Sequence, residues 1–315
     1  MSIDRRTLLT TGGASVAAIA LSRTAVAQAP DLGRDRLVML GTRGGPAIQG
    51  YAPSPSCSLL IYKGVPYVVD TGYGATFKLV EAGLPLPALR YIFITHHHSD
   101  HNLELGPVVY NAWVNGLRAT IDVYAPPGVN ALLAGYWQSN RYDIDIRVSD
   151  EGRPDLRTLV VPHEYGEGTV LANAGVEVTA LRNLHPPVTD SFALKFRLGD
   201  KTVVFSGDTA YFPPLAEFAK GADFLVHEVM YEPALEALVR RRPNAATLMQ
   251  HLRASHTLTE DVGKIATQAG VKTLVLNHFV PADDKSLTPQ MWIDAVRPTF
   301  AGTIIAARDL LEIPL

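Results

Sequence analysis

Cysteine is almost absent from this 315-residue sequence, in which Cys57 is the only one. A single cysteine cannot form an intrachain disulfide, and it also excludes a zinc site built on several thiolates. A strong charge of either sign is lacking too, because the formal net charge is −3 and charged residues make up 19% of the chain. We therefore expect no basic face of the kind that holds a nucleic acid.

Long hydrophobic runs are also missing. The apolar stretch near the N-terminus ends at about Leu21 and is too short to span a bilayer, which needs about 20 apolar residues. It lies between Arg5-Arg6 and the small residues Ala25-Val26-Ala27, an order typical of an export signal. The paired arginines resemble a twin-arginine signal, although a disordered tail with incidental arginines is the alternative.

These features predict three parts of the chain. Residues 1–27 would be a cleaved signal peptide of the twin-arginine type, and residues 28–35 the start of the mature protein. Residues 36–315 would form one domain. We expect a periplasmic protein without a membrane anchor, and its oligomeric state is left open.

Short apolar segments alternate with helical patterns along the predicted domain, and no internal repeat is present. The alternation has no clear strand–helix–strand period, which favours layered sheets flanked by helices. Arg141–Thr169 is polar and contains Gly and Pro, so we expect an irregular surface excursion there. The expected strands are Arg36–Leu40, Ser58–Tyr62, Pro66–Val69, Tyr91–Thr95, Ile121–Tyr124, Val176–Leu181, Phe192–Leu198, Thr202–Phe205, Phe224–Val226 and Thr273–Leu276. The expected helices are Ala75–Ala82, Pro127–Trp137, Pro214–Lys220, Pro233–Arg241, Thr259–Ala269 and Pro289–Val296.

A cluster of polar residues follows the apolar run Tyr91–Ile94. It reads His96-His97-His98-Ser99-Asp100-His101 and has the spacing H-x-H-x-D-H. Such a strand end places the polar side chains in one turn, where they offer two pairs of ligands. Imidazole nitrogens and a carboxylate suit zinc or a similar divalent ion. A surface histidine patch is the alternative, and Asp100-His101 at this spacing argue against it.

The motif resembles the metallo-β-lactamase superfamily, and further landmarks of that family occur in the same order from about Leu37 to the C-terminus. The resemblance implies an α/β fold, the αββα four-layer sandwich, and a site for two divalent metal ions, which we expect to be Zn²⁺. Asp70-Thr71-Gly72 resembles the family's turn with an aspartate behind the metal ligands. The implied ligands are His96, His98 and His185 for the first metal, Asp100, His101 and His278 for the second, and Asp208 as the bridge.

Seven ligands exceed what one tetrahedral zinc needs, whereas two ions that share Asp208 would have four each. A zinc-bound water has a pKa of about 7, so hydroxide would be available for hydrolysis. Asp100 is also expected to accept a proton from that water, and Asp70 to orient an imidazole. His97 is expected to point away from the site, and the other histidines not to act as ligands: His163, His227, His251 and His256.

Three further segments resemble the ribonuclease Z branch of the superfamily. They contain Glu228 in Asp223–Glu228, His256 in Ser255-His256-Thr257, and His278 in Asn277-His278-Phe279. Leu40–Pro46 resembles the first strand and glycine turn of the same branch. The resemblance implies that Glu228 and His256 act together near the leaving group. A structural hydrogen bond between them is the alternative.

The predicted function is that of a dinuclear metal-dependent hydrolase of a small anionic ester, either an aryl sulfate or a phosphate ester or diester. Nothing resembles the long basic arm that ribonuclease Z uses to hold tRNA, and an exported protein would not meet precursor tRNA. We therefore expect a small anionic substrate and no stable nucleic-acid partner. The alternatives are a ribonuclease Z-like or cyclic-nucleotide phosphodiesterase, a lactonase, and an inactive metal-binding scaffold. Candidates for an aryl pocket are Trp113, Tyr136, Trp137, Tyr142 and Tyr165, with positions in the core or on the ordinary surface as the alternative. A solvated helix end is expected at Arg240, Arg241 and Arg242, which could also attract an anionic substrate.

Overall fold

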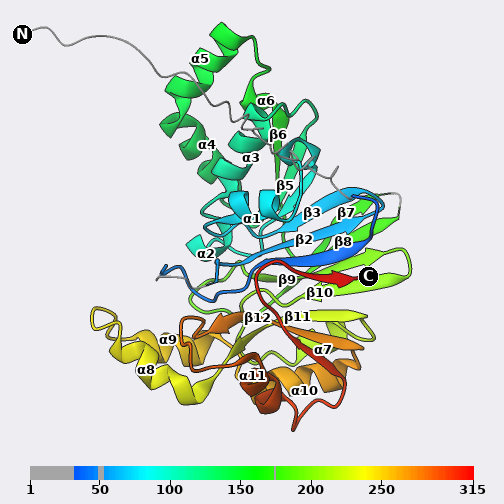
Figure 1. The fold of residues 1–315 in the computed structure, drawn as a ribbon, viewed down its shortest axis with the longest axis vertical. Helices are drawn as coiled ribbons and strands as arrows, with labels where there is room; N and C mark the ends of the chain where they lie inside the picture. Colours follow the sequence, from blue (N-terminus) through cyan, green and yellow to red (C-terminus); the bar gives the residue numbers. More distant parts are fainter. Residues whose placement is uncertain (1–31, 49–52, 174) are drawn as a thin grey trace, which may run out of the picture.

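The computed structural model describes residues 32–48, 53–173 and 175–315 (Figure 1). The predicted signal peptide, residues 1–27, lies outside the described residues. Within the described residues, no helix combines the length and the apolar character that crossing a membrane would need.

Two seven-stranded sheets form the centre of the molecule. The first has the strand order β14-β1-β2-β3-β4-β5-β6, and the second has the order β13-β12-β11-β10-β9-β8-β7. Both sheets are mixed, because β3 to β6 and β10 to β13 run parallel while the other neighbours are antiparallel. The first sheet comprises β1 (Arg36–Gly41), β2 (Cys57–Tyr62), β3 (Val65–Val69), β4 (Tyr91–Phe93), β5 (Ile121–Ala125), β6 (Val160–Glu164) and β14 (Leu311–Pro314). The second comprises β7 (Gly168–Asn173), β8 (Val176–Arg182), β9 (Phe192–Leu198), β10 (Lys201–Phe205), β11 (Phe224–Met230), β12 (Thr273–Val280) and β13 (Thr303–Ala306).

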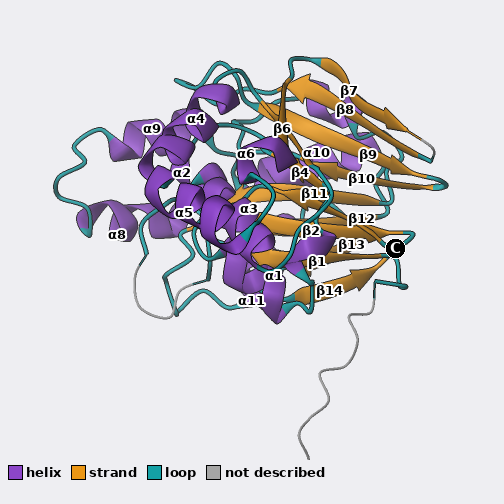
Figure 2. Cartoon of the chain, turned by 90° about the horizontal axis from the view of Figure 1, so that it is seen from above, coloured by secondary structure: helices purple, strands orange, loops and turns teal. Residues whose placement is uncertain are grey.

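Helices cover the outer faces of both sheets, as Figures 1 and 2 show. Those near the first sheet are α1 (Ala75–Glu81), α2 (Ser99–Asn102), α3 (Leu105–Val114), α4 (Val129–Ser139), α5 (Arg141–Glu151) and α6 (Leu156–Leu159), with the 3-10 turn η1 (Leu86–Ala88). Those of the other half are α7 (Pro214–Phe218), α8 (Leu235–Arg240), α9 (Leu248–Ser255), α10 (Thr259–Ala269) and α11 (Pro289–Val296), with the 3-10 turn η2 (Glu232–Ala234). The predicted αββα four-layer sandwich is confirmed.

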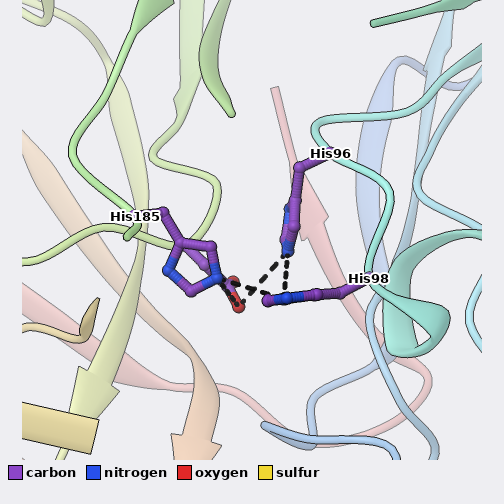
Figure 3. Close-up of side chains that lie close together, drawn as sticks. His96, His98 and His185 are labelled. Carbon is purple, nitrogen blue, oxygen red and sulfur yellow. Dashed lines mark hydrogen bonds and ion pairs between the residues drawn. The ribbon is translucent and has the colours of Figure 1, made fainter. Parts of the chain in front are cut away.

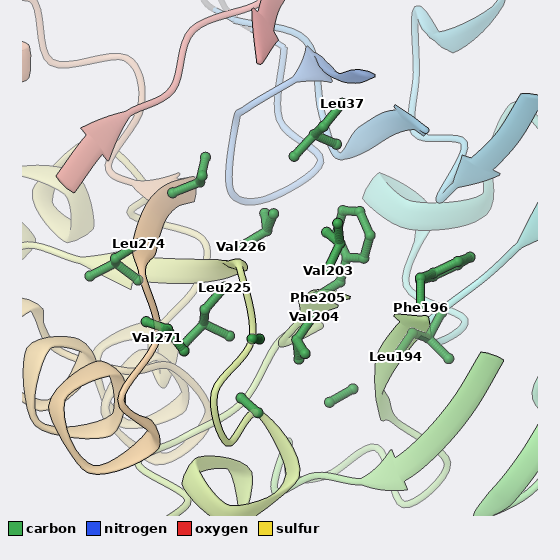
Figure 4. Packing of buried hydrophobic residues seen from close by; sticks show 14 of the residues in the cluster. Leu37, Leu194, Phe196, Val203, Val204, Phe205, Leu225, Val226, Val271 and Leu274 are labelled. Carbon is green, nitrogen blue, oxygen red and sulfur yellow. The ribbon is translucent and has the colours of Figure 1, made fainter. Parts of the chain in front are cut away.

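Strand β1 shows how the layers arise from the sequence. Successive side chains of a strand point to opposite faces of the sheet. Leu37 and Met39 accordingly join the core between the two sheets, while Val38 and Leu40 join the core under the helices of the first sheet. All four are buried, as expected for a strand covered on both faces. Figure 4 shows part of the core between the two sheets and under the helices of the second sheet, with Leu37 facing residues of the second sheet.

The predicted strands and helices agree with the structure to within a few residues. The helices α2, α3 and α9 and the strands β13 and β14 were not predicted, and one segment was predicted wrongly. Arg141–Thr169 was expected to be irregular, whereas it contains α5, α6, β6 and the start of β7. Pairs of opposite charge four residues apart stabilise α5, namely Asp143 with Arg147 at 2.9 Å and Arg147 with Glu151 at 2.8 Å. Ile144 on the same helix is fully buried. The prediction failed because the segment is polar overall, although α5 packs on the core through Ile144.

The two sheets bring the predicted site residues to one edge of the sandwich. Asp70 follows β3, and the His96–His101 motif follows β4, its parallel neighbour. In the second sheet, Asp208 follows β10, while Glu228 and His278 lie in the parallel strands β11 and β12. Carboxyl ends of parallel strands meet at the same edge, which is where such sheets commonly bind ligands.

Gly72 holds the turn after β3 close to the metal-ligand motif. A Cβ atom at this position would lie 2.2 Å from the carbonyl oxygen of Asp100. We therefore expect Gly72→Ala to destabilise the protein by about 3 kcal/mol and to lower its thermal midpoint by about 6–12 °C.

Gly135 supplies the matched control, because it lies in α4 and a Cβ atom there meets nothing within 4 Å. Gly135→Ala should raise the midpoint by about 1–3 °C, since alanine is the better helix former. Differential scanning fluorimetry of both variants measures these shifts. Equal midpoints for the two variants would contradict the close approach at Gly72.

Candidate metal centre

Three imidazoles and one carboxylate form the first cluster, and Figure 3 shows the imidazoles converging on one point. Nδ1 of His98 lies 3.1 Å from Nε2 of His96 and 3.1 Å from Nε2 of His185. An oxygen of Asp208 lies 3.8 Å from His96 and 3.9 Å from His185. A proton on one of these three nitrogens can form a good hydrogen bond with only one of the other two. A cation between them would accept the lone pairs of all three.

A second cluster shares Asp208 with the first and adds Asp100, His101 and His278. Nε2 of His278 lies 3.1 Å from Asp208 and 3.3 Å from Asp100. Nε2 of His101 lies 3.3 Å from the other oxygen of Asp208. In a tetrahedral zinc site with bonds of about 2.0–2.1 Å, neighbouring donor atoms are about 3.3 Å apart. The spacing within the second cluster therefore suits a metal ion.

The structure brings together all seven residues predicted as metal ligands. Six of them are buried, and His98 is partly exposed. Within the described part of the chain, Nε2 of His101 and Oδ1 of Asp208 are buried atoms without a hydrogen-bond partner. Buried polar atoms of this kind are rare unless a ligand or ion satisfies them. The two clusters thus fit a dinuclear metal site, and the assignment of each ligand to an ion stays a prediction.

The electrostatics of the clusters also favour a cation. Burial lowers the pKa of His101, but the carboxylates of Asp208, Asp70 and Asp100 outweigh it and raise that pKa well above its usual value. Burial raises the pKa of Asp100, yet His101 and His278 bring it down to about 2. Asp100 is therefore ionised and suited to ligate. Its additional role as a proton acceptor stays a prediction.

Residues behind the ligands hold the imidazoles in place. Oδ2 of Asp70 lies 2.8 Å from Nδ1 of His101, which confirms the predicted contact of Asp70 with a ligand ring. The other Asp70 oxygen accepts a hydrogen bond from the backbone N–H of Thr95 at 2.8 Å. Nδ1 of His185 lies 2.9 Å from the carbonyl oxygen of Ser255. These contacts leave Nε2 of each ring facing its cluster, the usual arrangement in metal sites.

Two site residues adopt backbone conformations that non-glycine residues rarely take. Asp70 has φ 61° and His278 has φ 45°. His278 also lies where the pairing of β11 with β12 shifts register, between the pairs Glu228 with Asn277 and Val229 with Phe279. A bulge of this kind re-aims one side chain out of the alternating pattern of a strand. It directs His278 into the cluster.

Glu228 and His256 form a buried pair beside the second cluster. Oε2 of Glu228 lies 2.9 Å from Nδ1 of His256 and 3.9 Å from Nδ1 of His278. Oε1 of Glu228 accepts a hydrogen bond from the backbone N–H of Thr209. Burial raises the pKa of Glu228 and lowers that of His256, because it disfavours the charged form of each. The predicted pairing of these two residues is confirmed as geometry, and their part in catalysis stays a prediction.

The remaining histidines lie outside both clusters of predicted ligands. His97 contacts the carbonyl oxygen of Pro126 at 3.0 Å and the side chain of Asn102 at 3.0 Å. His163 pairs with Asp122 at 2.7 Å. His227 is buried, which lowers its pKa to about 4.

A cavity of about 330 Å³ opens beside both clusters. The predicted aryl pocket is wrong, because none of its five aromatic candidates lines this cavity. Trp113 and Tyr165 are buried in the cores, and Tyr142 is 82% exposed. Residues that the sequence did not point to line it instead: Arg43, Leu238, Leu248, His251, Leu252 and Val280. For Arg43, the sequence did contain a signal, because a charged residue within the glycine turn Gly41–Gly45 is a candidate for a functional site.

Asp208 is the one carboxylate that both clusters share, and its pKa is held well below the usual value despite burial. We expect Asp208→Ala to lose most of both metal ions, because removing it takes a ligand from each. Elemental analysis of the purified variant measures the metal content per chain. His97→Ala is the matched control and should keep the wild-type content. Full metal content in Asp208→Ala would contradict a shared site.

Comparisons with known proteins agree with this site. The family described as beta-lactamase superfamily domain matches residues 67–279. A ribonuclease Z of Mycobacterium marinum is 29% identical over 277 residues, which cover 87% of this chain and 96% of the relative. Among solved structures, the metallo-beta-lactamase fold protein YhfI from Bacillus subtilis aligns with a TM-score of 0.66 and 21% identity, covering 89% of this chain and 99% of that one. Human tRNase Z, short form, aligns with a TM-score of 0.64 and 18% identity, covering 88% of this chain and 98% of that one.

The two structures share the fold with this chain, and the ribonuclease Z sequence is similar over nearly its whole length. The family match spans about two thirds of the chain and includes all seven clustered residues. The chain therefore belongs to the metallo-β-lactamase superfamily, in its ribonuclease Z-like branch, and is a metal-dependent hydrolase of that superfamily.

Proposed function

We propose that this hydrolase cleaves a small anionic ester, with a phosphodiester as the preferred substrate and an aryl sulfate as the second choice. The observation that carries the proposal is the cavity beside the two clusters. Its volume of about 330 Å³ lies at the lower end of small-molecule pockets. A ligand of one or two rings would fill it.

The cavity has two kinds of wall. His98, Asp100, Asp208 and His278 line it on the side of the clusters, while Leu238, Leu248, Leu252 and Val280 line it with aliphatic carbon. Such a cavity suits an ester whose charged centre lies at the clusters and whose organic group rests on the aliphatic side chains. The organic group accepted here is therefore apolar over much of its surface.

We propose zinc for the metal pair, because the donor set consists of imidazoles and carboxylates without a thiolate. Divalent ions held there would supply positive charge to an anionic ester and would lower the pKa of a coordinated water. The chain's own contribution is to hold the ligands rigidly. The Asp70 contact fixes the ring of His101, and the carbonyl of Ser255 fixes that of His185.

We propose that His256 delivers a proton to the leaving group. Its Nδ1 faces Glu228, which leaves Nε2 on the opposite edge of the ring, and His256 lines the cavity. Glu228 orients the ring. Burial lowers the pKa of His256, and the nearby carboxylates of Asp208 and Asp100 act against that effect. Carboxylate-held histidines commonly act in this way as general acids.

Cleavage of an RNA is the second candidate function, because the similar sequence from Mycobacterium marinum is named ribonuclease Z. The chain offers little electrostatic support for a polyanion, since its formal net charge is −3. The paired arginines Arg5-Arg6 also favour export, which we propose as well. N-terminal sequencing of the protein from a periplasmic extract, expected to begin near Gln28, tests the export proposal.

A substrate panel with the metal-loaded protein tests the proposed function. The panel contains 4-nitrophenyl phosphodiesters, a 4-nitrophenyl sulfate, a lactone and a precursor tRNA. We expect turnover of the phosphodiesters to exceed that of the others. Cleavage of the precursor tRNA alone would favour the second candidate. If the protein with full metal content hydrolyses none of these substrates, the result would favour the alternative of an inactive metal-binding scaffold.

The role of His256 predicts a dependence on the leaving group. Nitrophenolate departs readily as an anion, whereas an alkoxide needs a proton, and general acid catalysis is typically worth about 10²–10⁴-fold. We expect His256→Ala to slow esters with poor leaving groups by about that factor and activated esters far less, with both metals retained. Glu228→Gln should show the same pattern in weaker form.

Values of kcat/KM across phenols of graded acidity measure this dependence. Equal losses along the series would show that Glu228 and His256 only support the structure. His97→Ala again serves as control, because its ring lies away from the clusters and should leave the slope of the series unchanged.

A further inference from the structure

Arg43 is a buried guanidinium that no other described residue satisfies. It lies in the loop after β1, and its backbone N–H donates to the carbonyl oxygen of Ser54 at 3.0 Å. The residue is only 3% exposed, and its Nε and Nη1 atoms are buried without a hydrogen-bond partner in the described chain. Burial lowers the pKa of Arg43, which reflects the cost of keeping its charge there. Buried charges are normally paired, but here Asp283 and Asp100 act on Arg43 only through their field, without a hydrogen bond or ion pair to it among the described residues.

The side chain of Arg43 lines the same cavity as His98, His256 and His278. Its neighbour Gly45 donates its backbone N–H to Asp100 at 2.9 Å. A Cβ atom on Gly44 would lie 3.0 Å from Cε1 of His278. The loop that carries Arg43 therefore borders the metal centre directly, and a substrate at the clusters lies within reach of its guanidinium.

The carboxylates near Arg43 are already engaged by other groups. Asp283 lies 3.2 Å from Arg241 and 3.8 Å from Arg242, and Asp100 belongs to the second cluster. Arg242 also lines the cavity, and its side chain is 18% exposed. Asp283 thus faces three guanidiniums with one negative charge. The arginine side of the cavity carries a surplus of positive charge that is separate from the two clusters.

We propose that Arg43, assisted by Arg242, binds a second anionic group of the substrate, a carboxylate or phosphate on the arm of the ester that is not attacked. Nη2 is not among the buried nitrogens of Arg43, so this nitrogen and the guanidinium of Arg242 can donate to the oxygens of either group. The inference rests on the proposed function, because it places both groups of one substrate in one cavity. The preferred substrate is then an ester with two anionic centres joined by a short apolar spacer.

Matched substrates test this subsite in the metal-loaded enzyme. The first is 4-nitrophenyl phenyl phosphate, and the other two carry a carboxylate or a phosphate at the para position of the phenyl ring. The wild type should show a lower KM for the two substituted esters. Arg43→Gln should raise the KM of these two by about 10–100-fold, the range of a hydrogen-bonded charge pair, and that of the unsubstituted ester far less.

Three further variants sharpen the result. Arg43→Lys keeps the charge without the guanidinium and should recover part of the loss, and Arg242→Gln should give a smaller loss than Arg43→Gln. Arg240→Gln is the control, because Arg240 is 71% exposed, pairs with Glu236 and is not among the residues that line the cavity. It should change none of the constants. An equal rise in KM for all three esters in Arg43→Gln would overturn the proposal, since Arg43 would then act on the attacked group.

A binding measurement separates this proposal from the proposed function. Calorimetry compares phenyl phosphate with 4-carboxyphenyl phosphate on the metal-loaded protein, without any turnover. Tighter binding of the carboxylated compound, weakened in Arg43→Gln, supports the subsite even if no ester of the panel is hydrolysed. Equal affinity of the wild type for both compounds overturns it. If Arg43→Gln does not fold, Arg242→Gln and the wild type supply the same comparison.

Discussion

The buried carboxylate of Asp208 is the interaction on which the rest of the site depends. Its two oxygens lie within 3.9 Å of four imidazoles, those of His96, His101, His185 and His278. A buried carboxylate is costly unless positive charge compensates it. The imidazoles alone supply that charge only by taking up protons, whereas a pair of divalent cations supplies it permanently. Metal binding and the integrity of this sheet edge are therefore linked.

The centre also joins the two halves of the sandwich. His101 belongs to the loop after β4 in the first sheet, and it contacts Asp70 of that sheet and Asp208 of the second. Around this junction the chain accepts positive φ angles at Asp70 and His278 and leaves polar atoms without partners. Local departures of this kind collect at functional sites, where the surrounding fold compensates for them. The extensive cores on both faces of the sheets provide that compensation.

The wall of the cavity opposite the metal centre is built differently. Leu238, Leu248, Leu252 and Val280 belong to a small apolar cluster that is separate from the two large cores. Helices α8 and α9 contribute most of this wall, and they pack mainly on each other and on the ends of β11 and β12. The side chains of Leu238, Leu248 and Leu252 make none of the contacts that hold the ligands, although the carbonyl of Ser255 at the end of α9 contacts His185. The apolar wall and the metal centre therefore meet at α9, which carries Leu248 and Leu252 and ends beside His185.

The sequence by itself determined that the candidate ligands of the His96–His101 motif lie together, because close spacing in the chain brings their side chains into one turn. It also determined most strands, since short apolar runs are a local pattern. The resemblance to a known family added His185, Asp208 and His278 as candidate ligands. Only the tertiary structure showed that α5 packs on the core, because Ile144 and Val148 lie in an otherwise polar segment. It alone placed Arg43 and the aliphatic residues of α8 and α9 on the cavity, and it directed His278 into the cluster through a bulge. These features depend on contacts between segments far apart in the chain, and no local pattern records such contacts.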